Sequence, residues 1–325
     1  MILSRTLSLP HETCLGRLMC CIMKRIVRAS NRSRGASAST GATMLQTRDV
    51  VVDGVRSPVL QGGPTDAEEA VVFVHGNPGF SQDWKNLSER VSEFSRTVAP
   101  DMPGFGDADK PEDFDYTIDG YARHLEGLLC KLGVRRAHLV LHDFGGAWGL
   151  AWAAAHLSAL ASLTLINIGV LPGYRWHFLA RIWRTPVIGE IFMATTTRTG
   201  FRLLAKIGNP RGLPRSSVDQ TFDHFDSGTR RAVLRLYRAT DDIGAISERY
   251  GATLRSRACP TLVIWGRADP YIPVRYAERQ REYFPQAKMV ILDSSGHWPF
   301  IDNPDQVAAA VLPFLKSQIV AHGHL

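Results

Sequence analysis

The fold of this 325-residue chain is decided by the stretch LVLHDFGGAWG, residues 139–149. An apolar run ends here at a polar pair and continues into two glycines, a pattern typical of a buried strand that passes into a helix through a tight turn. Serine usually occupies the tip of such a turn, but this chain has Asp143 there. Three interpretations follow for Asp143: a nucleophile, a structural carboxylate, or the remnant of a site that has lost its activity.

Short apolar runs and longer amphipathic stretches alternate along most of the chain. The runs that we predict to be buried strands are residues 71–74, 97–99, 139–141, 163–166, 262–265 and 289–292. Helical patterns lie between them, including residues 116–132 and 305–319. This alternation predicts an α/β fold with a mostly parallel sheet and helices on both faces. The active site of such a sheet lies at the carboxyl ends of its strands, where polar residues follow these runs.

Residues 171–257 interrupt the alternation, because no strand pattern occurs among them. Helical patches separated by proline and glycine occur instead, at residues 175–183, 189–193, 201–207, 218–225 and 229–237. We expect a helical insertion of this kind, rich in aromatic residues, to cover the sheet edge and enclose a dry pocket. Residues 44–170 and 258–325 are therefore expected to form the two parts of one α/β core, and residues 171–257 its helical cap.

Residues 1–43 differ from the rest in composition. Seven lysines or arginines and a single acid, Glu12, lie in this segment, so it carries +6 of the net charge of +7. The remainder is close to neutral, which argues against a nucleic-acid-binding function. Three interpretations stay open: an organelle transit-like peptide, a weak signal peptide, or a start assigned upstream of Met44. We favour the last of these or a basic, disordered extension, and expect the fold to begin near Leu45.

Cysteine spacing and apolar runs bear on the compartment and on cofactors. After residue 43 the cysteines are Cys130 and Cys259, whose wide separation gives neither a disulfide framework nor zinc-site spacing. The apolar stretch at residues 18–26 is too short and too interrupted to span a bilayer. We therefore expect a cytoplasmic protein that has no metal, no cofactor and no stable membrane insertion.

Two further polar residues follow predicted strands. Asp269 lies in WGRADPYIP, and His297 lies in DSSGHWPF directly after the last strand. Together with Asp143 they give the chain order nucleophile, acid and histidine. A carboxylate at position 143 would also be stabilised by the amides of the helix that begins there. The sequence thus predicts a catalytic triad, while His75 and His142 are expected to orient neighbouring loops through hydrogen bonds.

Five motifs together resemble the α/β-hydrolase branch that contains epoxide hydrolases and haloalkane dehalogenases. The motifs are HGNPG (75–79), DMPGFGDADKP (101–111), HDFGG (142–146), GRADP (266–270) and SSGHWPF (294–300). The resemblance extends from about Leu45 to the C-terminus, and it implies the α/β-hydrolase fold and an enzyme with an aspartate nucleophile. It also implies a small apolar organic substrate, with water as the second reactant.

The resemblance implies a two-step reaction that suits a carboxylate. An aspartate is already ionised at neutral pH and can displace an oxygen or a halide from a saturated carbon, which leaves an alkyl ester on Asp143. His297, oriented by Asp269, would then activate water to attack that ester. The backbone amides of Phe144 and Asn77 are expected to hold the oxyanion of the second step.

The substrate depends on what stabilises the leaving atom. Epoxide hydrolases of this branch use cap tyrosines, which Tyr237 in RLYRAT and, less closely, Tyr174 in LPGYRW resemble. Dehalogenases of this branch pair the asparagine of HGNP, here Asn77, with a tryptophan after the nucleophile. This chain has Phe144 at that position, and phenylalanine has no N–H group. The resemblance therefore favours an epoxide hydrolase that forms vicinal diols, with a haloalkane dehalogenase as the alternative.

Other interpretations stay open. Without the resemblance, Tyr237 would be assigned to packing and Asn77 to shaping its turn. A non-catalytic ligand-binding protein of the same fold is a lower alternative, and the retained acid and histidine argue against it. An esterase or carbon–carbon hydrolase would require serine at position 143, because a carboxylate that attacks an ester forms only an anhydride.

Overall fold

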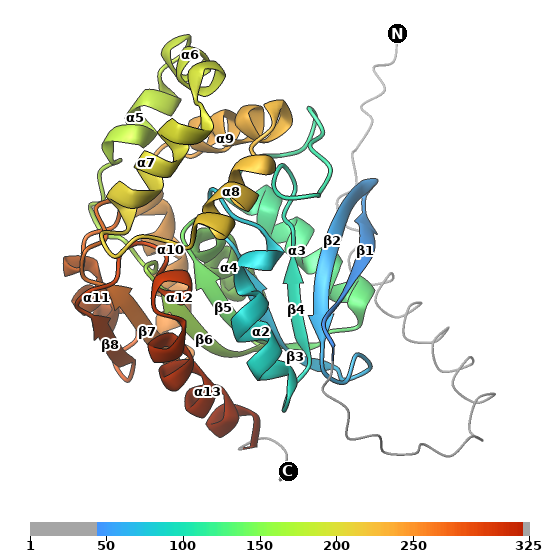
Figure 1. Cartoon of the computed structure of the whole chain (residues 1–325). Helices are drawn as coiled ribbons and strands as arrows, with labels where there is room; N and C mark the ends of the chain where they lie inside the picture. Colours follow the sequence, from blue (N-terminus) through green and yellow to red (C-terminus); the bar gives the residue numbers. More distant parts are fainter. Residues whose placement is uncertain (1–43, 321–325) are drawn as a thin grey trace, which may run out of the picture. The chain divides into compact units, whose positions relative to one another are not determined.

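The structure, a computed structural model, describes residues 44–320, which are built around an eight-stranded sheet (Figure 1). The strand order is β1-β2-β4-β3-β5-β6-β7-β8. The strands are β1 (Gln46–Val52), β2 (Val55–Gly62), β3 (Glu69–Val74), β4 (Thr97–Pro100), β5 (Arg136–His142), β6 (Leu160–Ile166), β7 (Thr261–Gly266) and β8 (Lys288–Leu292). From β4 to β8 all neighbouring strands pair in parallel. This topology confirms the predicted α/β fold, and all six predicted strands are present.

The hairpin formed by β1 and β2 is absent from the sequence-based prediction. These strands pair antiparallel at the edge of the sheet, and β2 also pairs antiparallel with β4. The connecting residues Asp53 and Gly54 have φ angles of 50° and 82°. Positive φ at both positions is the geometry of the two-residue turn for which Asp-Gly is a preferred pair. That dipeptide between two β-rich runs is the signal that would have found the hairpin.

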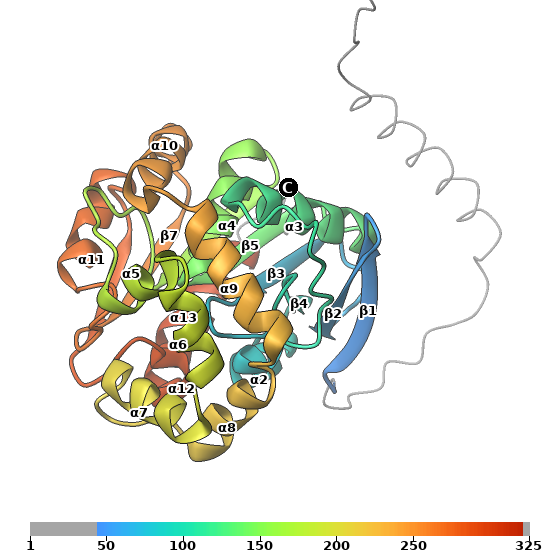
Figure 2. The same cartoon turned by 90° about the horizontal axis from the view of Figure 1, so that it is seen from above.

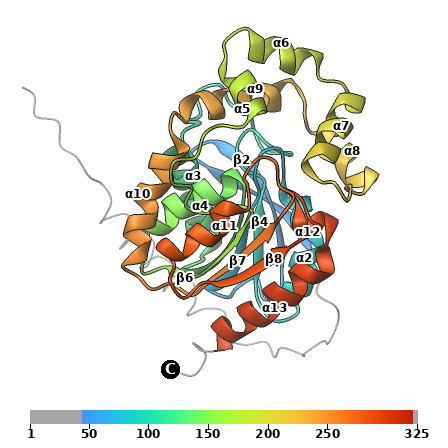
Figure 3. The same cartoon turned by 90° about the vertical axis from the view of Figure 1, so that its left-hand side faces the viewer.

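Helices cover both faces of the sheet, as predicted (Figure 3). One face carries α3 (Ile118–Leu132), α4 (Phe144–Ala155), α10 (Ile243–Arg255), α11 (Arg275–Arg279) and the short η2 (Gln280–Glu282). The other carries η1 (Ser81–Trp84), α2 (Lys85–Ser92), α12 (Pro299–Asp302) and α13 (Pro304–Val320). A buried apolar cluster lies on each face. The two clusters fix the sheet and therefore the loops at its carboxyl edge.

Local sequence explains the predicted helix α3. Thr117 caps its start, because the hydroxyl oxygen accepts a hydrogen bond from the backbone N–H of Gly120 at 3.1 Å. Gly133 ends the helix in the left-handed conformation, with φ 71°. Between these signals Tyr121, Leu125 and Leu128 recur at helical spacing and are completely buried. The prediction of a helix over residues 116–132 is confirmed to within two residues.

Five helices lie over the carboxyl ends of the strands (Figures 1 and 2). They are α5 (Phe178–Arg184), α6 (Ile188–Thr195), α7 (Arg198–Gly208), α8 (Arg215–Asp223) and α9 (Ser227–Ala239). Each overlaps a helical patch predicted from the sequence. Helix α10 was not predicted, and it packs along α4 of the core. The expected cap segment of residues 171–257 thus contains a lid, α5–α9, and one helix that belongs to the core layer.

The remaining predictions concern the N-terminal segment, membranes and metals. The interpretations of residues 1–43 as an extension or targeting segment lie outside the described residues. Within residues 44–320, no helix combines the length and apolar composition needed to cross a bilayer. The same residues contain no group of three histidine, cysteine or acidic side chains placed to hold a metal ion.

Candidate active site

Asp143 lies at the tip of a strained turn between β5 and α4. Its φ and ψ angles are 48° and −128°, a conformation that L residues rarely adopt. Two glycines make room for this turn. A Cβ atom on Gly76 would lie 2.3 Å from the Cβ of Asp143, and one on Gly145 would lie 2.3 Å from the carbonyl oxygen of Val74. Gly76 and Gly145 are therefore required by close packing around Asp143.

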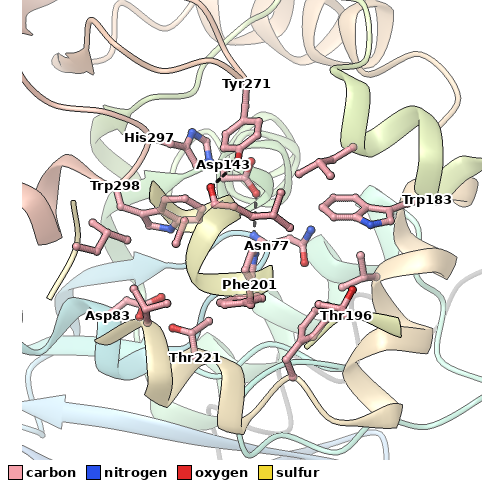
Figure 4. A pocket seen from close by; sticks show the side chains of 18 of the residues that line it. Asn77, Asp83, Asp143, Trp183, Thr196, Phe201, Thr221, Tyr271, His297 and Trp298 are labelled. Atoms are coloured by element: carbon pink, nitrogen blue, oxygen red, sulfur yellow. Dashed lines mark hydrogen bonds and ion pairs between the residues drawn. The ribbon is translucent and has the colours of Figure 1, made fainter. Parts of the chain in front are cut away.

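The structure brings Asp143, Asp269 and His297 together from the ends of β5, β7 and β8, and Figure 4 shows Asp143 and His297 at the pocket. Nδ1 of His297 lies 2.7 Å from Oδ2 of Asp269, and Nε2 lies 3.5 Å from Oδ2 of Asp143. The side chains of His297 and Asp269 are 2% and 0% exposed, against 12% for Asp143. The histidine thus bridges the two carboxylates, and the carboxylate at the turn is the one most open to a ligand.

Asn167, which the sequence analysis missed, supports Asp269. Its amide nitrogen donates to Oδ2 of Asp269 at 2.7 Å, and its amide oxygen accepts from the backbone N–H of Gly266 at 2.9 Å. The backbone N–H groups of Tyr271 and Ile272 donate to the other oxygen of Asp269. Asp269 is therefore held in one orientation. A polar residue directly after the predicted strand 163–166 was the available signal.

The resting triad is an ion pair. Burial alone would raise the pKa of Asp143, but the hydrogen bond and the charge of His297 outweigh it and lower the pKa to about 2. Burial likewise disfavours the imidazolium form of His297. The charges and hydrogen bonds of Asp269 and Asp143 outweigh this and raise the pKa of His297 to about 10. At neutral pH Asp143 is therefore ionised and His297 is protonated, and a protonated histidine cannot act as a base.

Two neighbouring histidines orient loops around the triad, as expected. Nε2 of His142 lies 2.8 Å from the backbone oxygen of His297, and burial lowers the pKa of His142 to about 3. Neutral His142 can therefore donate to that oxygen. Nε2 of His75 accepts from the backbone N–H of Met102 at 3.0 Å. Both contacts tie the segments that carry the site to each other.

Asn77 contacts the nucleophile through its backbone. Its N–H donates to Oδ1 of Asp143 at 2.7 Å, which leaves Oδ2 as the oxygen that faces His297. Phe144 provides the first residue of α4, and its ring packs 4.9 Å from that of Tyr237. The side-chain amide of Asn77 reaches the hydroxyl oxygen of Tyr237 at 3.4 Å, and its own oxygen is buried without a hydrogen bond among the described residues. Asn77 thus connects Asp143 with Tyr237.

The two tyrosines proposed from the sequence have different surroundings. Tyr237 on α9 is 2% exposed, and burial, together with the charge of Asp143, raises its pKa far above the usual value. Its hydroxyl therefore stays protonated, and within residues 44–320 that proton has no protein acceptor. The hydroxyl of Tyr174 donates to the backbone oxygen of Tyr271 at 3.0 Å. Tyr174 therefore has no free proton to offer to a ligand in this conformation.

Two pockets meet at Asp143. The larger measures about 910 Å³, including its open mouth, and Figure 4 shows side chains that line it. The smaller measures about 340 Å³ and is lined by Phe144, Tyr174 and Trp176 among others. Asp143, Tyr237 and His177 line both. Such a volume and a largely apolar lining suit a small organic molecule.

His177 is a second residue that the sequence analysis missed. Its Nδ1 accepts a hydrogen bond from the backbone N–H of Ala180 at 3.2 Å, at the start of α5. Burial lowers the pKa of His177 to about 4, so the ring is neutral and its single proton resides on Nε2. Histidine is not a preferred capping residue, and the sequence therefore carried no signal for this N–H donor between the two pockets.

The protonation of His297 predicts how stability varies with pH. Because folding raises its pKa from 6.5 to about 10, the stabilisation is complete below pH 6.5 and is lost as the pH rises through about 10. Asp143 stays ionised over that range, since its pKa is lowered. We expect the stability advantage of the wild type over His297→Gln to shrink between pH 6.5 and about 10. Urea unfolding of both proteins across this range measures it, and a constant difference would contradict the ion pair.

Comparison with known proteins agrees with this architecture. Residues 71–310 match the family described as "Alpha/beta hydrolase family". A cis-3-alkyl-4-alkyloxetan-2-one decarboxylase from Xanthomonas campestris pv. campestris is 28% identical over 285 residues, which covers 81% of this chain and 93% of the relative. A haloalkane dehalogenase from Mesorhizobium japonicum is 27% identical, with 84% of this chain and 91% of the relative covered.

A solved structure gives the same result for the fold. The haloalkane dehalogenase DbeA from Bradyrhizobium elkani superposes with a TM-score of 0.76 at 22% sequence identity, covering 86% of this chain and all of that one. The match to the family spans well over half of the sequence and includes the strands that carry Asp143, Asp269 and His297. The chain belongs to the alpha/beta hydrolase family.

Proposed function

We propose that this protein hydrolyses small epoxides to vicinal diols through an ester on Asp143. The observation that carries the proposal is the free proton of Tyr237. The hydroxyl is buried and un-ionised, and it accepts from Asn77 without donating to any described residue. An epoxide oxygen becomes an alkoxide when its ring opens, and a buried O–H donor is the group that this leaving atom needs.

In the first step Asp143 attacks a ring carbon. Oδ2 forms the new C–O bond while the bond from that carbon to the epoxide oxygen breaks. The oxygen takes the proton of Tyr237 and becomes a hydroxyl group. Oδ1 becomes the carbonyl oxygen of the ester and keeps its hydrogen bond to the backbone of Asn77.

In the second step water attacks the carbonyl carbon of this ester. Once Asp143 is esterified its charge disappears, and with it one of the interactions that keep His297 protonated. The pKa of His297 therefore falls, and the ring can transfer its proton to the Tyr237 phenolate and act as a base toward water. The amides of Asn77 and Phe144 support the oxyanion, and collapse of the intermediate releases the diol.

His177 is the second donor in this proposal, in place of Tyr174. A neutral imidazole with its proton on Nε2 can hydrogen-bond a developing alkoxide without first losing a charge. Its place at the junction of both pockets supports this role, as does the electrostatic influence that Asp143 exerts on it. The hydroxyl of Tyr174 is occupied by Tyr271, which argues against the tyrosine pair implied by the family resemblance.

A strained lactone is the second candidate substrate. The relative from Xanthomonas campestris is named for decarboxylation of an oxetan-2-one, and that ring also opens with an oxygen leaving group. Attack by Asp143 on the saturated ring carbon that is bonded to the ring oxygen would break that C–O bond and release a carboxylate. Loss of carbon dioxide from that carboxylate would form an alkene and free Asp143 without water. A halide would lack the donor that Phe144 does not provide, but it could still meet the amide of Asn77 and the indole N–H of Trp183, which lines the larger pocket without a hydrogen bond to the described residues.

Replacing Tyr237 by phenylalanine tests the proposed function. We expect kcat toward an epoxide to fall about 100-fold or more, because the leaving oxygen loses its proton donor. Turnover is measured with an epoxide, a haloalkane and an oxetan-2-one of matched carbon skeleton. The haloalkane rate should respond much less, since a halide needs no proton.

Tyr174→Phe is the matched control for that experiment. It removes the same oxygen from a hydroxyl that already donates to Tyr271, so its effect on the epoxide rate should be much smaller. Equal losses in both variants would contradict the assignment of Tyr237. Turnover of the haloalkane or the lactone without turnover of the epoxide would contradict the epoxide proposal and identify the other compound class as the substrate.

A further inference from the structure

Asp83 is an acidic side chain in the larger pocket that the proposed mechanism does not use. It belongs to η1, which follows the HGNPG loop, and it lines the pocket together with Asp143. Its Oδ2 accepts a hydrogen bond from the backbone N–H of Phe80 at 3.1 Å. Its Oδ1 accepts none from any residue in the range 44–320. The side chain is neither fully buried nor exposed, as expected for a carboxylate with one oxygen toward a pocket.

No cation compensates this carboxylate within the described part of the chain. No lysine, arginine or histidine nitrogen of residues 44–320 lies within 4.0 Å of it, unlike most of the acids around it. His224, which stacks 4.5 Å from Phe80, pairs with Asp107 instead. Burial, and secondarily the charge of Asp101, raise the pKa of Asp83 to about 7. The carboxylate is thus desolvated at a free-energy cost that a hydrogen-bond donor would reduce.

The turn itself does not require this charge. The bond from Phe80 uses one acceptor oxygen, and asparagine, serine or threonine provides such an oxygen without an ionisable group. The second oxygen of Asp83 therefore makes no hydrogen bond that the described fold requires. A carboxylate oxygen that lines a ligand pocket and has no partner among the described residues is placed to meet a polar atom of the ligand.

The position of Asp83 defines which part of a ligand it would meet. In Figure 4, Asp83 and Thr221 lie across the pocket from Tyr271 and His297, with Phe201 and Trp298 among the side chains between them. A substrate whose ring lies at Asp143 would extend along these aromatic walls. Its far end would then arrive at Asp83.

We propose that the larger pocket binds a substrate whose end remote from the reacting ring carries a hydrogen-bond donor, a hydroxyl or a protonated amine, which binds Oδ1 of Asp83. The ring chemistry in this inference rests on the proposed function. The requirement for a hydrogen-bond donor at the far end of the substrate rests on Asp83 alone. The substrate class is therefore an aliphatic epoxide with a polar terminus rather than a simple alkyl epoxide.

The experiment compares three epoxides that share one chain and end in methyl, hydroxyl or amine, over several chain lengths. For the best length, kcat/KM of the hydroxyl or amine compound should exceed that of the methyl compound about 10- to 100-fold, the range for a hydrogen bond to a charged group. Asp83→Asn keeps an oxygen for the bond from Phe80 and turns an NH₂ group toward the pocket. In this variant the ratio for the amine compound should fall to about one or below, because an NH₂ group cannot accept a hydrogen bond from a protonated amine.

Thr221→Val is the matched control. It removes another pocket hydroxyl, one that already donates to the backbone oxygen of Ser217 at 3.0 Å, and it should keep the wild-type ratio. A wild-type ratio near one, a ratio retained by Asp83→Asn, or equal losses in both variants would overturn the inference. If none of the three epoxides is turned over, the proposed function fails. Binding of the corresponding diols, measured by calorimetry in wild type and Asp83→Asn, then decides the role of Asp83 separately.

Discussion

Replacing Asp143 by alanine is expected to reduce kcat at least about 10⁴-fold, the scale seen when a covalent nucleophile is removed. No second carboxylate of the described residues is placed to substitute for it. Asp269 is occupied by His297, Asn167 and two backbone amides. Multiple-turnover kinetics on the epoxide that the wild type prefers measure the loss, and a residual rate within about tenfold of wild type would exclude Asp143 as the nucleophile.

This variant needs a control for folding, because it leaves His297 without one of its partners. Alanine at position 143 removes side-chain atoms and adds none, so it creates no new clash with Gly76 or Gly145. We expect the pKa of His297 to fall but the fold to persist. Thermal unfolding with and without the product diol tests whether the fold persists, because a ligand-dependent rise in Tm requires an intact pocket.

Local patterns made most of the fold predictable. The stretch at residues 139–149 contains an apolar run, a polar tip and small residues, and each feature is set by neighbours in sequence. Helix α10 was missed because two glycines, Gly244 and Gly251, interrupt an otherwise helical spacing of apolar residues. Both glycines allow close packing, since a Cβ on Gly251 would lie 2.6 Å from a side-chain carbon of Val170. Tertiary packing overrides helix propensity there.

The triad was predictable because each of its residues follows a strand. Asp143, Asp269 and His297 lie at strand ends, so one rule about parallel sheets sufficed to bring them together. His177 and Asp83 lie on other elements, and their position at the pockets depends on how the lid and the HGNPG loop fold back. Sequence spacing does not encode that geometry.

The hydroxyl of Tyr174 illustrates the same limit at the level of one atom. Its place early in the cap segment was compatible with a role toward the substrate. Which acceptor it finds depends on the backbone of Tyr271, nearly a hundred residues later in the chain. The identity of a residue can therefore be predicted from a motif, while the direction of its hydrogen bond follows from tertiary structure.

Replacing His297 by glutamine is expected to stop the reaction at the ester on Asp143. Glutamine can still occupy the space near Asp269 and Asp143, but it cannot accept a proton from water. At a pH where Asp143 is ionised, alkylation needs the carboxylate and the proton of Tyr237 but no base, so the first step should proceed while turnover falls about 10²- to 10⁴-fold, the contribution of a general base. Intact mass spectrometry after incubation with substrate detects the ester.

The mass of the adduct also identifies the substrate class. An epoxide adds its whole mass to the protein, whereas a haloalkane adds its mass less hydrogen halide. An oxetan-2-one that loses carbon dioxide leaves no lasting adduct, because alkene formation frees Asp143 without a base. The double variant Asp143→Ala, His297→Gln is the control, and it should take up no mass from any of the three. An adduct of equal yield on the double variant would locate the nucleophile elsewhere. Full turnover by His297→Gln would show that the histidine is not the base of the second step.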